Sequence, residues 1–172
     1  MSSSSISGSL QAGVGHTTRA GGLTAPVMGA EVLWSYALTE KVAIGLGGVG
    51  DMQFLEPDEI ALAEFNFAGR ASVGTLLFHS ADDTYFLAPS VNLDAGGRVM
   101  NYKTGPLVRG SVALTNYFSL HASSSLKDSP VLTVQLEGGR NFIEYTAGNA
   151  AGSPSNFLLL TAGGAFAFPL GN

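Results

Sequence analysis

The stretch Ile6-Ser7-Gly8-Ser9-Leu10-Gln11-Ala12-Gly13-Val14 alternates residue by residue between apolar and small or polar side chains. Successive side chains of a β-strand point to opposite faces, so this segment has one apolar face and one polar face. A second run repeats the rule, and its apolar register holds Met28, Ala30, Val32, Trp34, Tyr36 and Leu38. The chain therefore begins with two amphipathic strands.

The same alternation continues along the chain and predicts an all-β protein with ten strands. These cover residues 4–15, 26–38, 42–54, 61–77, 84–99, 106–114, 118–126, 130–138, 142–147 and 156–168. Tight turns alternate with longer, more varied loops, which is the pattern of an antiparallel up-and-down barrel with turns at one rim and loops at the other. We expect one barrel domain over residues 1–172, with eight strands as the alternative count.

Two of the expected turns have closely similar sequences. The segment Ala37-Leu38-Thr39-Glu40-Lys41-Val42-Ala43-Ile44 closely parallels Ala113-Leu114-Thr115-Asn116-Tyr117-Phe118-Ser119-Leu120. Each predicts a strand end, a tight turn and a new strand start. Further turns are expected at 79–83 and at 139–141, and the second of these splits 130–147 into two strands. Pro89 lies inside a predicted strand, so a bulge or a missing ladder hydrogen bond is expected there.

The composition decides which face of each strand is outside. Charged residues make up 12% of the chain, about half the share usual for a soluble domain. A soluble protein covers its surface with Lys, Glu and Arg, and this chain has too few to do so. We therefore interpret the apolar register as lipid-facing and the polar register as the lumen of a transmembrane β-barrel. The net charge of −5 argues against nucleic acid as a partner.

Charged residues of both signs fall on the polar register. In a narrow lumen they would have to pair, because separated charges there are poorly hydrated. The predicted polar network of the lumen consists of Glu31, Glu64, Arg70, Asp94, Arg98, Arg109, His121 and Glu137. The same register also holds Asp51, Gln53, Asn66, Ser72, Asn92 and Gln135. Cys is absent and the three His residues are far apart, so neither a metal site nor a cofactor is predicted.

Aromatic residues gather at the expected turn rim, where amphipathic rings would sit at a membrane interface. The predicted interface aromatics are Trp34, Tyr36, Phe78, Tyr85, Phe118, Phe166 and Phe168. A second band toward the loop rim is formed by Phe54, Phe65, Phe67 and Tyr102.

With these features the chain resembles the small outer-membrane β-barrels of Gram-negative bacteria, the group that includes the OmpA transmembrane domain and the OmpX-like proteins. The resemblance covers essentially the whole chain. It rests on the strand-turn-strand segment at 36–47, the similar segment at 113–120 and the final segment Gly163-Gly164-Ala165-Phe166-Ala167-Phe168.

This resemblance implies a monomeric outer-membrane protein in contact with the lipid bilayer and lipopolysaccharide. It implies no enzymatic activity, and either a structural or interaction role or limited passage of small solutes through a lumen largely filled by side chains. Met1 is followed directly by Ser2-Ser3-Ser4-Ser5, so we read the sequence as a mature form from which a signal peptide has been removed.

Two alternatives from other classes stay open. A soluble or periplasmic barrel in the manner of lipocalins would bind an apolar ligand inside, with Val32, Trp34 and Leu46 lining the pocket. A lipid-modifying barrel hydrolase would use His121, Ser123 and Glu137, with the His or the Ser on the outer face.

Overall fold

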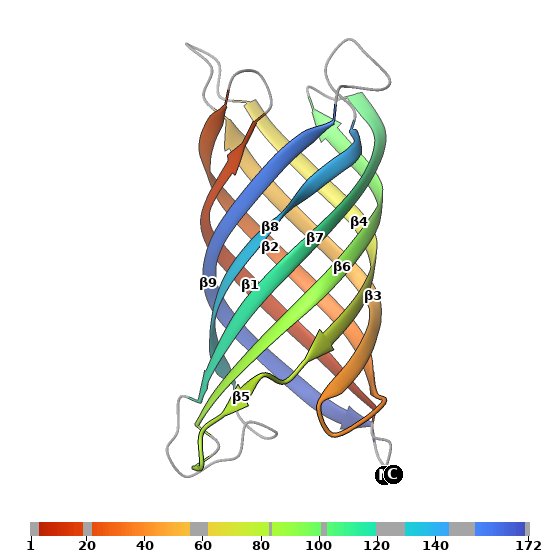
Figure 1. Ribbon diagram of the computed structural model, residues 1–172. Helices are drawn as coiled ribbons and strands as arrows, with labels where there is room; N and C mark the ends of the chain where they lie inside the picture. The colour runs from red at the N-terminus through yellow and green to blue at the C-terminus, as the bar shows by residue number, and fades with distance from the viewer. Residues whose placement is uncertain are drawn as a thin grey trace.

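Eight long antiparallel strands close into a barrel in the computed structural model, which describes residues 4–18, 22–55, 62–82, 84–100, 103–119, 130–144 and 154–170 (Figure 1). The barrel strands are β1 (Ser4–Thr17), β2 (Leu23–Ala37), β3 (Val42–Leu55), β4 (Leu62–Thr75), β6 (Tyr85–Met100), β7 (Lys103–Ser119), β8 (Val131–Glu144) and β9 (Ser155–Leu170). Each pairs with its neighbours in the chain, and β1 pairs with β9 to close the barrel. Closure leaves no barrel strand with an open edge. A short strand, β5 (Phe78–His79), pairs with β6 beyond the end of β4.

The strands are strongly staggered around the barrel. One circuit of directly paired residues runs Ser4, Tyr36, Ile44, Val73, Val91, Val112, Gly138, Leu158 and His16. The circuit returns to β1 12 residues beyond its start, from Ser4 to His16. In a closed barrel such a stagger requires the strands to tilt steeply against the axis, as Figure 1 shows.

The two rims differ in what they carry. The start of β1 and the end of β9 lie at one rim with the β2–β3 turn (Leu38–Lys41) and β5, and we call this end the turn rim (Figure 1). The opposite end is the loop rim. At the turn rim, hydrogen bonds with Ser80 and Thr84 keep the pKa of the exposed Asp82 below its usual value.

The count of ten strands is wrong, and the alternative count of eight is confirmed. The two extra turns expected at 115–117 and 139–141 are interior parts of β7 and β8. The predicted loop at 127–129 and most of the predicted strand over 118–126 lie outside the described residues.

The similar segments 37–44 and 113–120 adopt different structures because their polar side chains have different hydrogen-bond partners. In the β2–β3 turn, Thr39 Oγ1 accepts hydrogen bonds from the backbone N–H groups of Lys41 and Val42, at 3.2 and 3.0 Å. The matching part of β7 bonds to its neighbouring strands instead. Asn116 donates to the Val134 carbonyl at 3.2 Å and accepts from the Tyr85 hydroxyl at 2.8 Å.

The segment at 139–141 also continues its strand. Asn141 points inward and donates to Ser155 Oγ at 2.9 Å, which joins β8 to β9. A bulge next to it shifts the register between Val108 and Arg109 of β7. Phe142 is the extra residue, and therefore Phe142 and Ile143 both face outward in succession.

Pro89 occupies a gap in the ladder. The pairing of β4 with β6 ends at Ser90, and the pairing of β5 with β6 begins at Leu87. Pro89 therefore faces no paired residue on that edge, although it still pairs with Leu114 of β7. The expected missing ladder bond is confirmed.

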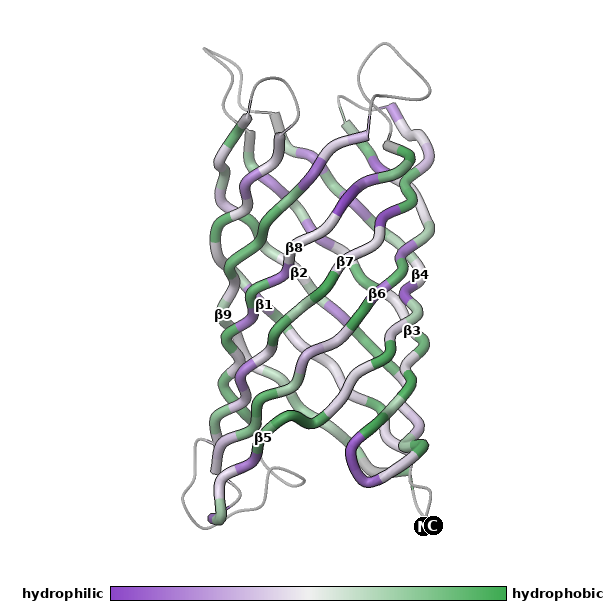
Figure 2. The backbone as a smooth tube through the Cα atoms, in the orientation of Figure 1, coloured by the Kyte–Doolittle hydropathy of each residue, from purple (hydrophilic) through white to green (hydrophobic). Residues whose placement is uncertain are grey.

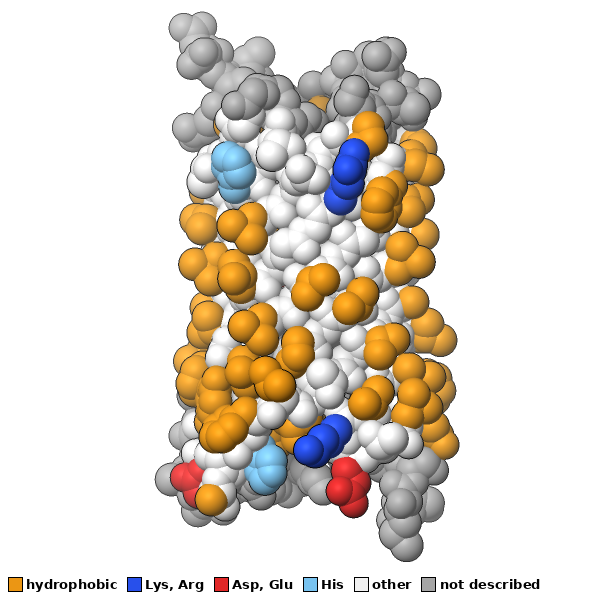
Figure 3. All heavy atoms as spheres, viewed as in Figure 1, with side chains coloured by type: hydrophobic (Ala, Val, Ile, Leu, Met, Phe, Trp, Pro, Cys, Tyr) orange, Lys and Arg blue, Asp and Glu red, His pale blue; other side chains and the backbone are white. Residues whose placement is uncertain are grey.

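The faces of the strands have the polarity that the composition predicts. Apolar and polar residues alternate along each strand (Figure 2), and apolar side chains cover the outside between two rims where the charged groups in view lie (Figure 3). Leu10, Val32 and Val112 are 68%, 57% and 58% exposed, whereas Arg70 and Asp94 are 5% and 0% exposed. Within the described ranges, no helix is long and apolar enough to cross a membrane.

Candidate functional site

The centre of the lumen is organised by one guanidinium group. Arg70 on β4 makes a bidentate contact with Asp94 on β6, from Nε to Oδ1 at 2.7 Å and from Nη2 to Oδ2 at 2.9 Å. Its Nη1 donates to Glu31 Oε2 on β2 at 2.6 Å, and its Nη2 donates to Glu137 Oε1 on β8 at 3.0 Å. A single side chain thus ties four strands together through charge-assisted hydrogen bonds.

A second guanidinium extends this contact toward the loop rim. Arg109 on β7 donates from Nε to Asp94 Oδ2 at 2.6 Å and from Nη1 to Asp51 Oδ2 at 2.7 Å. Its Cζ lies 5.6 Å from the centre of the Phe157 ring, within the range of a cation–π contact. Asp94 therefore bridges two arginines and is itself fully buried.

A third ion pair completes the chain of contacts. Arg98 Nε lies 2.9 Å from Glu64 Oε1 and donates to Asn66 Oδ1 at 2.8 Å. Asn66 in turn donates to Asp51 Oδ1 at 2.7 Å. The polar groups thus form one connected network from Glu31 to Glu64.

Neutral side chains of β1, β7, β8 and β9 fill the gaps between these charges. Gln135 donates to Glu137 Oε2 at 2.9 Å and accepts from Gln11 at 3.1 Å. Thr161 donates to Gln11 Oε1 at 2.6 Å. Ser111 donates to Glu137 Oε1. Glu137 therefore accepts hydrogen bonds at both oxygens, which is what a buried carboxylate needs.

The structure brings together seven of the eight residues expected in the lumen. Glu31, Glu64, Arg70, Asp94, Arg98, Arg109 and Glu137 all belong to the connected network. His121 and Ser123 lie outside the described residues. Asp51 shares the polar register in the sequence, but nothing in the sequence alone shows that it bridges Arg109 and Asn66.

Apolar residues that the alternating pattern did not predict also lie inside the barrel. Leu107, Val27, Phe157, Leu159 and Met100 are buried. They stand on the inward register of their strands, where the pattern led us to expect polar side chains. The lumen beside the ion pairs is therefore packed with hydrocarbon as well, and the ion pairs lie in surroundings of low polarity.

Among the described residues, the network joins more carboxyl than guanidinium groups. It contains three guanidinium groups, Arg70, Arg98 and Arg109. It contains five carboxyl groups, Glu31, Asp51, Glu64, Asp94 and Glu137.

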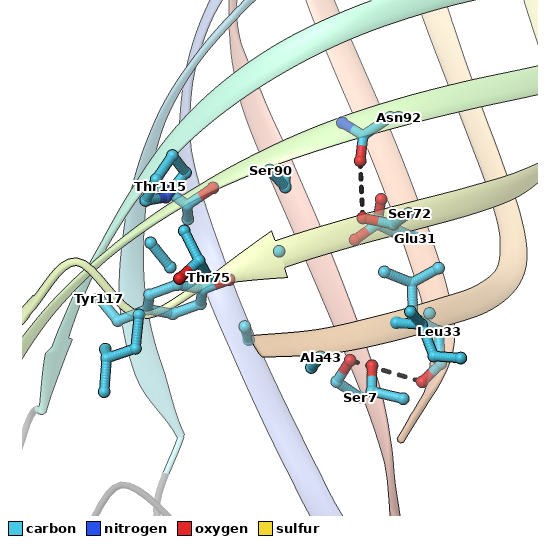
Figure 4. Close-up of a pocket in the computed structure, with 18 of the residues that line it drawn as sticks. Ser7, Glu31, Leu33, Ala43, Ser72, Thr75, Ser90, Asn92, Thr115 and Tyr117 are labelled. Carbon is cyan, nitrogen blue, oxygen red and sulfur yellow. Dashed lines mark hydrogen bonds between the residues drawn. The ribbon is translucent and has the colours of Figure 1, made fainter. Parts of the chain in front are cut away.

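The half of the lumen toward the turn rim is hollow. A cavity of about 340 Å³ extends from the network to the β2–β3 turn. Figure 4 shows part of its wall, which is made mostly of small hydroxyl, amide and methyl groups. Among its lining residues are Ser7, Glu31, Ser35, Ser72, Ser90, Asn92, Thr115 and Tyr117. Toward the loop rim the described side chains enclose spaces of only about 40 and 10 Å³.

The seven expected interface aromatics lie toward the turn rim and form close pairs. Ring centres are 6.5 Å apart in Trp34–Tyr36, 5.1 Å in Tyr85–Phe118 and 5.5 Å in Phe166–Phe168. Phe78 packs on Tyr85 at 5.9 Å. Of the second band, Phe54, Phe65 and Phe67 face outward, whereas Tyr102 lies outside the described residues.

The lipocalin-like alternative requires the apolar faces of the strands to point into the barrel and the polar faces to point outward. The structure contradicts it. Val32, Trp34 and Leu46 are 57%, 43% and 55% exposed on the outside, so they line no internal pocket. Among the described residues, no group of three or more His, Asp or Glu side chains is arranged to hold a metal ion.

Comparison with known proteins shows the fold. The structure matches that of Neisserial surface protein A (NspA) with a TM-score of 0.59 and 9% identity, over 95% of this chain and 96% of that one. Two structures of Ail, the attachment invasion locus protein of Yersinia pestis, match with 10% identity over 96% of this chain and 100% of theirs. Their TM-scores are 0.49 alone and 0.47 with the heparin analogue sucrose octasulfate.

No protein-family model matches the sequence, and a search of the curated proteins finds no match. NspA is an eight-stranded barrel of the Gram-negative outer membrane. The expected resemblance to this group is therefore confirmed at the level of the fold.

Proposed function

We propose that this protein is an integral β-barrel of the bacterial outer membrane whose lumen is sealed by its own side chains. Its role is structural or interactive, and it neither conducts solutes steadily nor catalyses a reaction. The observation that carries the proposal is the connected network around Arg70, which joins β2, β4, β6 and β8 across the lumen.

The outer face supports the membrane location. Its apolar register continues around the described strands, and aromatic pairs such as Trp34–Tyr36 lie toward one rim. Exposed apolar surface on every strand would make a soluble monomer aggregate, whereas lipid chains cover it at no cost. At the other end, Arg140 and His16 stand on the outward register, where they suit contact with lipopolysaccharide phosphates.

The network supports a closed lumen for an electrostatic reason. A solute that passes must separate Arg70 from Asp94, and separated charges in a space lined by Leu107, Phe157 and Leu159 are poorly solvated. The small spaces of about 40 and 10 Å³ on the loop side leave no room for a hydrated ion to pass without such a separation.

Recording from single barrels in a planar lipid bilayer tests this function. We expect no steady current from the unmodified protein and brief openings from Arg70→Ala, because Glu31 and Glu137 then lose their cationic partner and Asp94 loses one of its two. Arg140→Ala, which removes an outward arginine, is the matched control and should stay silent. Large, steady currents from the unmodified protein would overturn the sealed lumen and make passive solute diffusion the function.

A further inference from the structure

We propose that an oblique hollow on the outer wall of the barrel binds lipid A, with an acyl chain along the hollow and a phosphate group at Arg140. This site rests on the proposed function, because only a protein of the outer membrane meets lipid A, and it gives one part of the outer face a specific partner. The hollow is a space of about 800 Å³ that is open to the outside.

The hollow climbs the wall toward the loop rim along two adjacent rows of directly paired residues. One row runs from Ile44 on β3 to Gly138 on β8. The other runs from Leu46 on β3 to Arg140 on β8. The first row belongs to the staggered circuit described above, which rises from the turn rim to the loop rim. The loop-rim end of the hollow is therefore at Arg140.

The upper part of the hollow is bare because two glycines stand next to Arg140. Gly110 of β7 is its direct partner, and Gly138 precedes it by two residues on the outward register of β8. Farther down, the lining residues Val91 and Val112 are 60% and 58% exposed. Figure 3 shows a pale area in the upper half of the visible face, where backbone and small groups reach the surface. Bare backbone between apolar side chains leaves room for a hydrocarbon chain to lie against the wall.

The charge at the end of the hollow determines the kind of head group. Among the described residues that line the hollow, Arg140 alone is charged. Its side chain is exposed, and it makes no hydrogen bond or ion pair with the described residues. Asn156 of β9 lies directly opposite and adds an amide group to the same end. A guanidinium group binds phosphate oxygens in a bidentate manner, so an apolar chain with a phosphate head fits the hollow.

A second polar group lies on the other side of β9. His16 of β1 pairs with Leu158, which is the next outward residue after Asn156 along β9. Two strand spacings and one two-residue step place the Cα atoms of Arg140 and His16 about 12 Å apart. Thr24 Oγ1 lies 2.9 Å from Nδ1 of His16, whose Nε2 has no partner among the described residues. Two separate groups that bind phosphate suit the two phosphates of lipid A better than the single phosphate of a phospholipid.

Native mass spectrometry of the folded barrel, released from nonionic detergent micelles, tests the site. The probes are diphosphorylated lipid A, the same lipid without its phosphates, and phosphatidylethanolamine. We expect one lipid A per barrel, bound about tenfold or more tightly than either of the other lipids. Arg140→Gln removes the charge from the hollow and should lower the affinity for lipid A about tenfold or more. Lys103→Gln is its matched control, because it removes an exposed charge from the loop rim outside the hollow.

A second variant tests the hollow itself. Gly138→Leu fills its upper part, and the new Cβ atom would lie 3.4 Å from Leu158 Cδ1, the end of a flexible side chain that can move. Gly164→Leu adds the same side chain to the outward register of β9, where a Cβ atom meets nothing within 4 Å. Gly138→Leu should lose most of the bound lipid A, whereas Gly164→Leu and Lys103→Gln should retain as much as the unmodified protein.

The site is refuted if lipid A is not retained, if either of the other lipids is retained equally well, or if Arg140→Gln and Gly138→Leu bind as tightly as their controls. A second barrel held in place of lipid A would assign the hollow to a contact between copies of the chain and would also refute the site. Insertion into phosphatidylcholine vesicles is measured in parallel. A barrel that inserts but does not retain lipid A leaves the proposed function standing, whereas a barrel that does not insert contradicts that function.

Discussion

At the scale of single residues, Arg70 holds the polar network of the lumen together. Its guanidinium group reaches carboxylates on β2, β6 and β8, and it is 5% exposed. The alternation in the sequence predicts that Arg70, Asp94 and Glu137 share one register, because side-chain parity is a local property of a strand. Which carboxylate meets which guanidinium depends on the stagger between strands, and no local pattern contains that information.

Replacing Arg70 with Met should destabilise the folded barrel by about 3–5 kcal/mol, because Glu31 and Glu137 lose their cationic partner and the buried Asp94 keeps only Arg109. The measurement is the free energy of unfolding by urea in lipid vesicles, followed by the fluorescence of Trp34. Arg140→Met removes an exposed arginine and should change this free energy by less than about 0.5 kcal/mol. Equal losses in the two variants would contradict the central place of Arg70.

At the scale of strands, close packing between neighbours limits what a position accepts. A Cβ atom at Gly47 of β3 would collide with the carbonyl oxygen of Val32 in β2 and lie 2.8 Å from Leu33 Cα. At Gly164 of β9 a Cβ atom would meet nothing within 4 Å. The two glycines look alike in the sequence but differ in the space around them.

Gly47→Ala should therefore lower the stability of the barrel by about 1–3 kcal/mol, because the neighbouring backbone has to move. Gly164→Ala should leave it within about 0.5 kcal/mol of the unmodified protein. Urea unfolding of both variants in the same vesicles provides the comparison. A neutral Gly47→Ala would show that β2 and β3 are not packed as described.

The two faces of a strand should also respond differently to charge. Val32→Arg places a cation on the outward apolar face and should cost about 2–4 kcal/mol if that position lies near the middle of the membrane. Ser72→Arg points into the cavity, which has polar walls and room for a longer side chain, and should cost less. The readout is the unfolding free energy in vesicles, and equal costs would show that the inward and outward registers are assigned wrongly.

Similar local sequences can also adopt different structures, so a prediction from one segment does not carry over to another. Thr39 and Thr115 lie in closely similar sequence segments. Thr39 nevertheless accepts hydrogen bonds within a turn, whereas Thr115 lies inside β7. The difference lies in the partners that β6 and β8 supply to β7, as the bonds of Asn116 to Tyr85 and Val134 show. The sequence therefore predicts the barrel and its faces, but it overcounts the strands by two.

At the scale of the whole molecule, the barrel separates two environments. Its outer face is apolar with aromatic pairs toward one rim, and its interior holds a connected ionic network with a cavity below it. The apolar residues inside, such as Leu107 and Phe157, escaped prediction because they stand on a register otherwise occupied by polar side chains. The alternation does not show which inward positions are apolar, because that depends on how the strands pack in three dimensions.

The most direct test of the outward apolar face uses Trp34, the only tryptophan of the chain, which is 43% exposed on the outside toward the turn rim. The folded protein is placed in vesicles that contain lipids brominated at known depths along their acyl chains. We predict strong quenching of Trp34 by bromines close to the headgroups, weaker quenching by deep ones and little quenching by aqueous iodide, as for a tryptophan at a membrane interface. Strong quenching by iodide with none from the brominated lipids would contradict the account.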